Sequence, residues 1–343
     1  ESVNDVYESF TTHRMLGRAP GGGFSYNKDN PLPFRLIVAD ESSMYDVALM
    51  YALCQAIDDG CALLIVGDTD QLPSIGAGAV LNDLIASELF GVSRLTQIHR
   101  QAALSKIITN AHAINNGRPQ DLQVGGDFSL VRRDTSEEVQ EACIAVYEKM
   151  ITKGIKPDDI MVLTSGHKAA SGTMEVNEAL RKRFNPSPAK TLKAGKTIFG
   201  VGDRIIVTRN NYKLDVRNGQ MGMIKDINTE DSIVICEIEG RTVEFTKSFI
   251  SELRHGYCIT IHKAQGSQAK YVIMLVDKAH YMLLERTLVY TGVTRGISHV
   301  VVVSRQDALE HAIRNKRSRE RKTALYSHLR RRRHEPTLPA VAA

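Results

Sequence analysis

The sequence predicts an α/β protein with two domains built on parallel sheets and a small β-rich insertion in the second domain. Three observations indicate this: short apolar runs that end in polar residues, helical stretches between those runs, and a change of texture after residue 198. A length of 343 residues is typical of about two domains. A hydrophobic content of 43% and a charged content of 24% exclude a disordered chain.

The first domain is expected over residues 1–93. Residues 35–41 and 61–68 are unbroken apolar runs that end in acidic residues, as in strands buried on both faces of a parallel sheet. Between them, residues 45–57 carry apolar side chains at helical spacing. These three segments together predict a strand-helix-strand unit. The ligand-binding edge of such a unit lies at the carboxyl ends of its strands.

The second domain is expected over residues 94–198 and 254–313. Its predicted strands are residues 160–164, 271–277 and 300–304. Its predicted helices are residues 137–152 and 174–184. The insertion, residues 199–253, consists of short β-rich runs separated by polar turns, which predicts a small antiparallel barrel or sheet.

The net charge of +5 is unevenly distributed. Ten Lys or Arg face one acid, Glu320, between Arg314 and Arg333, so this segment carries +9 and the other residues sum to −4. Residues 314–343 are interpreted as a basic tail, most simply a solvated and partly helical end, with a DNA or partner contact as the alternative. The charge balance excludes a uniformly basic nucleic-acid coat.

No apolar run reaches the roughly 18–20 residues of a membrane span, and five scattered cysteines indicate a reducing compartment. We therefore expect a cytoplasmic protein with no membrane contact. The first residue is Glu1, which suggests a processed or truncated product.

Two polar segments follow the predicted strands of the first domain. Asp40 and Glu41 follow the first strand, where nucleotide hydrolases carry a Mg²⁺ ligand and a group that activates water. The alternative is a solvated acidic pair that caps the next helix. Gln71 follows the next strand and either faces a terminal phosphate or belongs to an ordinary loop.

Three further segments could meet phosphate. Arg100 and Arg295 carry planar guanidinium groups that suit phosphate oxygens, although a lone arginine is usually a surface residue. Residues 259–267 form an apolar strand that breaks into a turn, where Thr260, His262 and Ser267 supply donors.

The phosphate loop GxxxxGK[ST] does not occur in the sequence. Gly195-Lys196-Thr197 has the right ending, but Lys190 stands where the first glycine is required. The eleven histidines show no metal-ligand spacing.

Eight segments in this order resemble the RecD-like DNA helicases of superfamily one. They are Thr12–Gly17, Val38–Met44, Val66–Ser74, Arg94–Gln101, Phe199–Arg204, Asn218–Gly222, Thr260–Ser267 and Tyr290–Arg295. The resemblance implies two RecA-like motor domains, the first N-terminally incomplete, and an SH3-like insertion. Residues 17–34 fall where the family carries a short hairpin that separates strands.

The resemblance also implies roles for single residues. By position, Asp40 binds Mg²⁺, Glu41 activates water and Gln71 senses the γ-phosphate, while Arg100 and Arg295 are arginine fingers. The implied contacts to single-stranded DNA come from six residues: Thr12, His13, Thr260, His262, Lys263 and Ser267. ATP and Mg²⁺ are the implied cofactors.

The family couples ATP hydrolysis to domain closure and moves five-prime to three-prime on single-stranded DNA toward duplex junctions. We expect a monomer, with any protein partner unknown. Two departures are the phosphate loop, expected upstream of Thr12, and Gln268, where relatives carry an acid. Without the loop we expect the chain alone to be ATPase-deficient.

Two alternatives remain open. One is the helicase-like part of a conjugative relaxase or of an exonuclease complex. The other is a non-catalytic module that binds single-stranded DNA, which the joint presence of Asp40, Glu41, Gln71, Arg100 and Arg295 disfavours.

Overall fold

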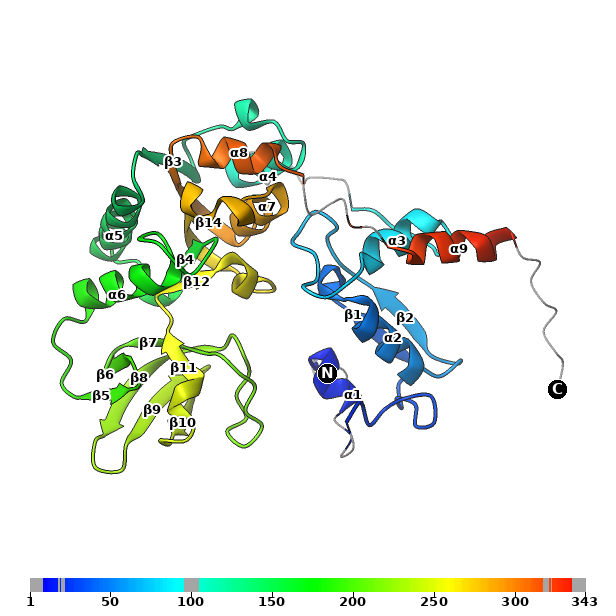
Figure 1. Cartoon of the computed structure of the whole chain (residues 1–343), viewed down its shortest axis with the longest axis horizontal. Coiled ribbons are helices and arrows are strands. Elements are labelled where there is room, and N and C mark those ends of the chain that lie inside the picture. Colours follow the sequence, from blue (N-terminus) through cyan, green and yellow to red (C-terminus); the bar gives the residue numbers. More distant parts are fainter. Residues whose placement is uncertain are drawn as a thin grey trace, which may run out of the picture. The chain divides into compact units, whose positions relative to one another are not determined.

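The computed structural model describes residues 9–17, 19, 22–95, 105–316, 321 and 323–334. The chain divides into two units, one of residues 1–97 together with 317–343 and one of residues 98–316 (Figure 1). No helix in the described part of the chain is long and apolar enough to cross a membrane.

The first unit is built on the predicted strand-helix-strand element. Strands β1 (Leu36–Ala39) and β2 (Ala62–Ile65) pair in parallel, and α2 (Val47–Ala56) connects them. Asp46 begins α2 because its carboxylate accepts a hydrogen bond of 2.7 Å from the Leu49 amide. The expected parallel-sheet architecture is confirmed here.

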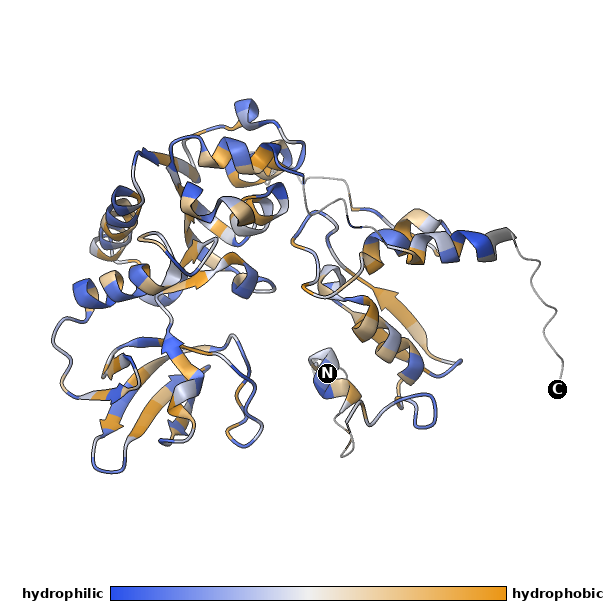
Figure 2. Cartoon of the chain, in the orientation of Figure 1, coloured by the Kyte–Doolittle hydropathy of each residue, from blue (hydrophilic) through white to orange (hydrophobic). Residues whose placement is uncertain are grey.

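One face of this sheet is covered and the other is not. Ile37 and Ala39 pack with Met50 and Leu53 of α2 in a buried core. The alternate side chains are exposed, and they are apolar: Leu36, Val38, Leu64 and Val66 (42–56% exposed). Figure 2 shows both strands as hydrophobic. Parallel sheets are normally buried on both faces, so this face is one that additional chain can cover.

Residues 17–34, where a hairpin is expected, contain no strand in their described part. Asn27 and Asn30 form one isolated antiparallel bridge, and the Asn27 carboxamide accepts a hydrogen bond from the Asp29 amide. The loop is fixed at its end by the Leu32 amide, which donates to Ala56 of α2 at 2.7 Å.

The second unit contains a five-stranded parallel sheet in the order β12-β4-β13-β14-β3. The strands are β3 (Phe128–Arg133), β4 (Ile160–Thr164), β12 (Cys258–Thr260), β13 (Ala269–Val276) and β14 (Gly296–Arg305). The helices are α4 (Lys106–Asn115), α5 (Ser136–Thr152), α6 (Thr173–Phe184), α7 (Arg286–Val293) and α8 (Ala308–Arg314). The three strands and two helices predicted for this domain are all present.

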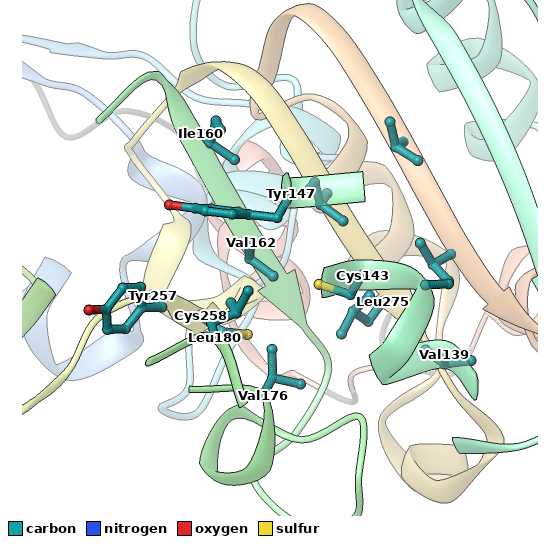
Figure 3. Close-up of a cluster of buried hydrophobic side chains, with 14 of the residues drawn as sticks. Val139, Cys143, Tyr147, Ile160, Val162, Val176, Leu180, Tyr257, Cys258 and Leu275 are labelled. Atoms are coloured by element: carbon teal, nitrogen blue, oxygen red, sulfur yellow. The ribbon is translucent and has the colours of Figure 1, made fainter. Parts of the chain in front are cut away.

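A continuous apolar core joins α5 and α6 to the sheet (Figure 3). Val139, Cys143 and Tyr147 of α5 and Val176 and Leu180 of α6 are buried against the strands. These positions recur at the spacing of one helix face, which is why the sequence predicts both helices. The core fixes the end of β12, from which a candidate site segment emerges.

The insertion is a five-stranded sheet in the order β10-β9-β8-β7-β11, with antiparallel pairing throughout. Its strands are β7 (Arg204–Val207), β8 (Met221–Asn228), β9 (Ile233–Ile238), β10 (Arg241–Phe245) and β11 (Leu253–His255). Before it stands an antiparallel hairpin of β5 (Thr191–Ala194) and β6 (Thr197–Gly200). The short β-rich runs predicted for the insertion are confirmed as an antiparallel sheet, whereas β5 lies before the residues where β structure was expected.

Asp203 fixes the junction between the insertion and the parallel-sheet domain. Its carboxylate is fully buried and accepts hydrogen bonds from the Arg181 side chain (2.8 Å), the Asn185 carboxamide (2.7 Å) and the Gly200 amide (2.6 Å). Burial alone would raise the pKa of Asp203, but the contacts with His255, Arg181 and Asn185 outweigh it and lower the pKa. The carboxylate is therefore a structural anion.

Replacing Asp203 with alanine should lower the free energy of unfolding by about 3–5 kcal/mol, because the substitution leaves Arg181, whose side chain is 13% exposed, and the buried Gly200 amide without their shared acceptor. Urea denaturation measures this. The matched control is Glu178→Ala, which removes an exposed ion pair with Lys182 on α6 and should cost at most about 1 kcal/mol. Equal losses in the two variants would contradict the anchoring role.

The same anion predicts a pH dependence. Because the folded-state pKa of Asp203 is depressed, its stabilising contribution is present above the unfolded value near 4 and is lost as the pH falls through the folded value. The stability difference between wild type and Asp203→Asn should therefore shrink on acidification below about pH 4.

The C-terminal segment is partly helical, as in the interpretation from the sequence, and part of it packs on the first unit. Arg321, Thr323 and α9 (Leu325–His334) group with the first unit, where Leu325 packs against the apolar core. Helix α9 lies along α3 (Val80–Ser87). The contacts of this segment with the first unit could not be predicted from the sequence, because a run of basic residues is usually solvated.

Candidate functional site

Asp40 and Glu41 leave the carboxyl end of β1, as predicted. Two backbone hydrogen bonds of 2.9 Å hold this end against β2, from the Val66 amide to Ala39 and from the Ser42 amide to Val66. Glu41 has a φ of 49°, a left-handed conformation that a residue other than glycine rarely adopts. Six other non-glycine residues in the described part of the chain share this conformation, so it fixes the local backbone at Glu41 but does not by itself mark a functional site.

Gln71 lies in the turn that follows β2. The Asp68 carboxylate organises the turn, because it accepts hydrogen bonds from the Asp70 amide (2.8 Å) and from the Gln71 carboxamide nitrogen (3.4 Å). The Gln71 side-chain oxygen is buried and has no hydrogen-bond partner among the described residues. The turn therefore presents an unused acceptor.

Two hydroxyl groups share this property. The Ser42 and Ser43 hydroxyls are also buried without a hydrogen-bond partner in the described part of the chain. Gly67 permits the close approach, since a Cβ there would lie 2.5 Å from the Ser42 hydroxyl. Unsatisfied buried polar atoms call for an explanation, and a polar ligand at the ends of β1 and β2 supplies one.

The donor set fits a magnesium nucleotide. Mg²⁺ is held by one or two carboxylates together with phosphate oxygens and waters, not by a cage of protein ligands. The described residues contain no group of three or more His, Cys, Asp or Glu side chains that could hold a metal alone. Asp40 is exposed and Glu41 is half-buried, which leaves both within reach of a ligand.

Thr12 and His13 lie on α1 (Thr12–Leu16) of the same unit. The Thr12 hydroxyl is hydrogen-bonded to the hydroxyl of Tyr45, four residues beyond Glu41. His13 is exposed, and the centroid of its ring lies 5.8 Å from the centroid of the Phe24 ring. The structure thus links Thr12 to the segment that carries the acidic pair.

In the second unit, Thr260 ends β12 and begins a short 3-10 helix, Ile261–Ala264. Its hydroxyl accepts a hydrogen bond of 3.3 Å from the Lys263 amide. Burial lowers the pKa of His262, although Glu285 opposes the shift, so the ring is neutral at pH 7. Burial and the nearby Arg254 lower the pKa of Lys263.

Arg295 and Ser267 are brought together. The Arg295 side chain is 3% exposed and donates to the carbonyls of Thr291 (3.1 Å) and Ser267 (3.2 Å). The guanidinium thus holds the turn that follows the 3-10 helix. Arg100 lies outside the described residues.

A groove of about 1140 Å³ opens beside Thr260 and Lys263. Its walls come from α6, the β5–β6 hairpin and the insertion. Six cationic side chains line it: Arg181, Lys193, Lys196, Lys247, Arg254 and Lys263. Glu178 is the carboxylate among the lining residues, and Arg181 is already paired with the buried Asp203. Such a charge balance suits a polyanion, and hydroxyls of Thr260 and Thr208 add neutral donors.

The sequence did not assign five of these cations: Arg181, Lys193, Lys196, Lys247 and Arg254. The available signal is the pair Lys193 and Lys196 on either side of Gly195, which places two positive charges near the tip of one hairpin. The sequence does not show that this hairpin faces Thr260, so the two lysines predict only an ordinary polar turn.

Three family models match the chain in order. Residues 5–135 match an AAA domain, residues 176–237 the SH3 domain of ATP-dependent RecD-like DNA helicases, and residues 255–303 the C-terminal domain of UvrD-like helicases. The matched segments contain the acidic pair, the β5–β6 hairpin with the first part of the insertion, and the Thr260–Ser267 turn.

Two curated relatives align over most of the chain. The ATP-dependent RecD2 DNA helicase of Deinococcus radiodurans is 33% identical over 93% of this chain, which covers 43% of that protein. The RecBCD enzyme subunit RecD of Mycolicibacterium smegmatis is 31% identical over 93% of this chain and 59% of its own length. The chain thus spans about half the length of these relatives.

Among solved structures, the chain resembles the Pif1 helicase from Bacteroides in complex with ADP-AlF3 and single-stranded DNA. The TM-score is 0.55 at 16% identity, over 85% of this chain and 78% of the other. This similarity supports the fold: two parallel-sheet domains, the second with an antiparallel SH3-like sheet.

Proposed function

Since the chain belongs to the RecD-like helicases of superfamily one, we propose that it is the motor core of an ATP-dependent DNA helicase that translocates on single-stranded DNA and unwinds duplex. The observation that carries the proposal is the polar cluster at the ends of β1 and β2. There, two carboxylates stand beside three buried, unsatisfied oxygen atoms.

In this proposal, each residue of the cluster has a separate role in ATP hydrolysis. Asp40 holds Mg²⁺, which neutralises developing phosphate charge when bound. Glu41 orients the attacking water and accepts its proton, for which its fixed left-handed backbone is suited. The free oxygen of Gln71 accepts from that water or from a phosphate-bound group, so that the turn organised by Asp68 responds to the terminal phosphate.

Arg100 and Arg295, both in the unit of residues 98–316, act as arginine fingers in this proposal. Because the fingers and the acids belong to different units, hydrolysis requires closure and is thereby coupled to movement along DNA.

Single-stranded DNA binds through the cationic groove of the second unit and through Thr12 and His13 of the first. Thr260, His262, Lys263 and Ser267 contact the phosphate-sugar backbone, which gives binding without sequence preference. His262 contributes hydrogen bonds and not charge, because its lowered pKa keeps the ring neutral.

The chain itself should bind single-stranded DNA but turn over little or no ATP, because its 343 residues contain no GxxxxGK[ST] to hold the β- and γ-phosphates. In the proposed motor, a segment carrying such a loop would cover the exposed apolar face of β1 and β2 at Leu36, Val38 and Leu64.

Two measurements test the function. Titration with oligothymidine should show affinity that falls steeply with salt, and Lys196→Ala should reduce the slope of log K against log salt by about 0.7. Phosphate release should be undetectable from this chain and should appear, stimulated by DNA, in a chain extended upstream through a phosphate loop. DNA-stimulated turnover by the 343 residues alone would refute the assigned deficiency.

A second candidate is the motor of an exonuclease complex, favoured by the 31% identity to the RecBCD enzyme subunit RecD. A stable complex on co-purification, with unwinding that depends on the partner, would favour it. A relaxase motor and a non-catalytic DNA-binding module have no such supporting observation.

A further inference from the structure

Arg321 follows the second unit in the sequence but belongs to the first unit in the structure. Its guanidinium donates four hydrogen bonds, to the carbonyls of Ser74 (2.5 Å), Gly76 (2.9 Å) and Gly78 (2.8 Å) and to the Ser74 hydroxyl (3.3 Å). Residues 74–78 begin three positions after Gln71. A single side chain therefore ties together the loop that continues from the proposed phosphate sensor.

Two neighbouring contacts fix the segment that carries Arg321. The Thr323 hydroxyl donates a 2.9 Å hydrogen bond to the Asp83 carboxylate on α3. Leu325 packs against the core that contains Leu53 and Val80. Because Asp83 and Leu325 are held by the body of the first unit, Arg321 has a rigid support.

The other side of the loop rests on the start of α2. The Val47 amide donates to Ala77 at 3.0 Å. Gly76 and Gly78 permit this approach, since a Cβ at these positions would lie 2.0 Å from the Asp46 carboxylate and 2.4 Å from a Val47 methyl. The loop is thus clamped between α2, which follows the acidic pair, and Arg321.

We propose that Arg321 is a positioning residue for Gln71: it holds the 74–78 loop so that the Gln71 side chain stays aligned with the acidic pair. This inference rests on the proposed function. Arginine suits the task because its planar, forked donors reach several carbonyls at once, which a lysine ammonium cannot do in the same geometry.

The connectivity adds a consequence. The chain leaves the second unit at residue 316 and re-enters the first at residue 317. The loop next to Gln71 is therefore held by Arg321, a residue five positions after the end of the second unit. Loss of Arg321 should weaken DNA stimulation of hydrolysis more than basal hydrolysis.

The first test is hydrogen exchange on this chain and needs no activity. Arg321→Ala should speed exchange of two amides by roughly tenfold or more: that of Val47, which donates to the Ala77 carbonyl of the loop, and that of Gln71, which donates to Asp68. The substitution frees the loop from its four hydrogen bonds to Arg321. Arg331→Ala, at an exposed position on α9, is the matched control and should leave these amides unchanged. If Arg321→Ala does not fold, Arg321→Lys takes its place, with the same expected direction.

The second test is ATPase kinetics of the upstream-extended protein. For Arg321→Ala we expect kcat with DNA to fall about tenfold while the KM for ATP and the affinity for DNA change little. Unchanged exchange of the Val47 and Gln71 amides, or unchanged DNA-stimulated kcat, would overturn the inference. Its failure is separable from that of the proposed function, which would show as turnover that survives Glu41→Gln.

Discussion

Glu41→Gln should reduce ATP turnover by about 10²- to 10⁴-fold in the upstream-extended protein, with nucleotide and single-strand binding retained. The substitution keeps the shape and the hydrogen-bonding reach of the side chain but removes the group that accepts a proton from water. Glu41 is half-buried at the end of β1, and its backbone is fixed at a φ of 49°. Single-turnover phosphate release measures chemistry apart from binding.

Glu88 supplies a matched control. It is the residue after α3, has a φ of 57° and is exposed, so Glu88→Gln changes the same chemical group in the same backbone conformation on the same unit. We expect no loss of turnover from it. Turnover near the wild-type rate in Glu41→Gln would show that Glu41 does not act as the base, whereas equal losses in both variants would indicate a general electrostatic effect.

The sequence predicted those parts of the fold in which one element carries its own signal. The runs at 35–41 and 61–68 are continuous and apolar, so their length and polar ends were enough to place β1, β2 and the acidic pair after β1. The same holds for α5 and α6, whose apolar residues repeat on one face. In these elements, local pattern and burial coincide.

Elements that depend on distant partners were missed. Strand β3 pairs with β14, about 170 positions further along the chain, and its exposed end, Arg132-Arg133, gives no strand pattern. The hairpin of β5 and β6 has only four residues per strand. No local rule distinguishes such segments from polar loops, because their partners are chosen by tertiary packing.

The candidate site shows the same division. Asp40, Glu41 and Gln71 were predicted because each follows an apolar strand. Arg321 could not be, because it is one of ten basic residues in a segment whose composition indicates solvent exposure. Only the carbonyls of Ser74, Gly76 and Gly78 distinguish it from its neighbours, and those carbonyls lie more than 240 positions earlier.

Arg295→Ala should lower DNA-stimulated ATP hydrolysis by about 10³- to 10⁵-fold, the range for removal of an arginine finger. In the structure the guanidinium already holds the Ser267 carbonyl, within the turn proposed to contact DNA. Losing that one hydrogen bond should cost about 1 kcal/mol, or roughly fivefold in single-strand affinity. The two effects therefore differ by at least about two orders of magnitude.

That difference separates two roles for the same side chain. A finger requires the planar fork at the transition state, so Arg295→Lys should restore DNA affinity but not hydrolysis. Arg314→Ala, at an exposed position that ends α8, removes an equal charge from the same unit and should change neither quantity. If Arg295→Ala lowers hydrolysis and affinity by the same factor, Arg295 acts by holding the Ser267 turn on DNA and does not reach the phosphate.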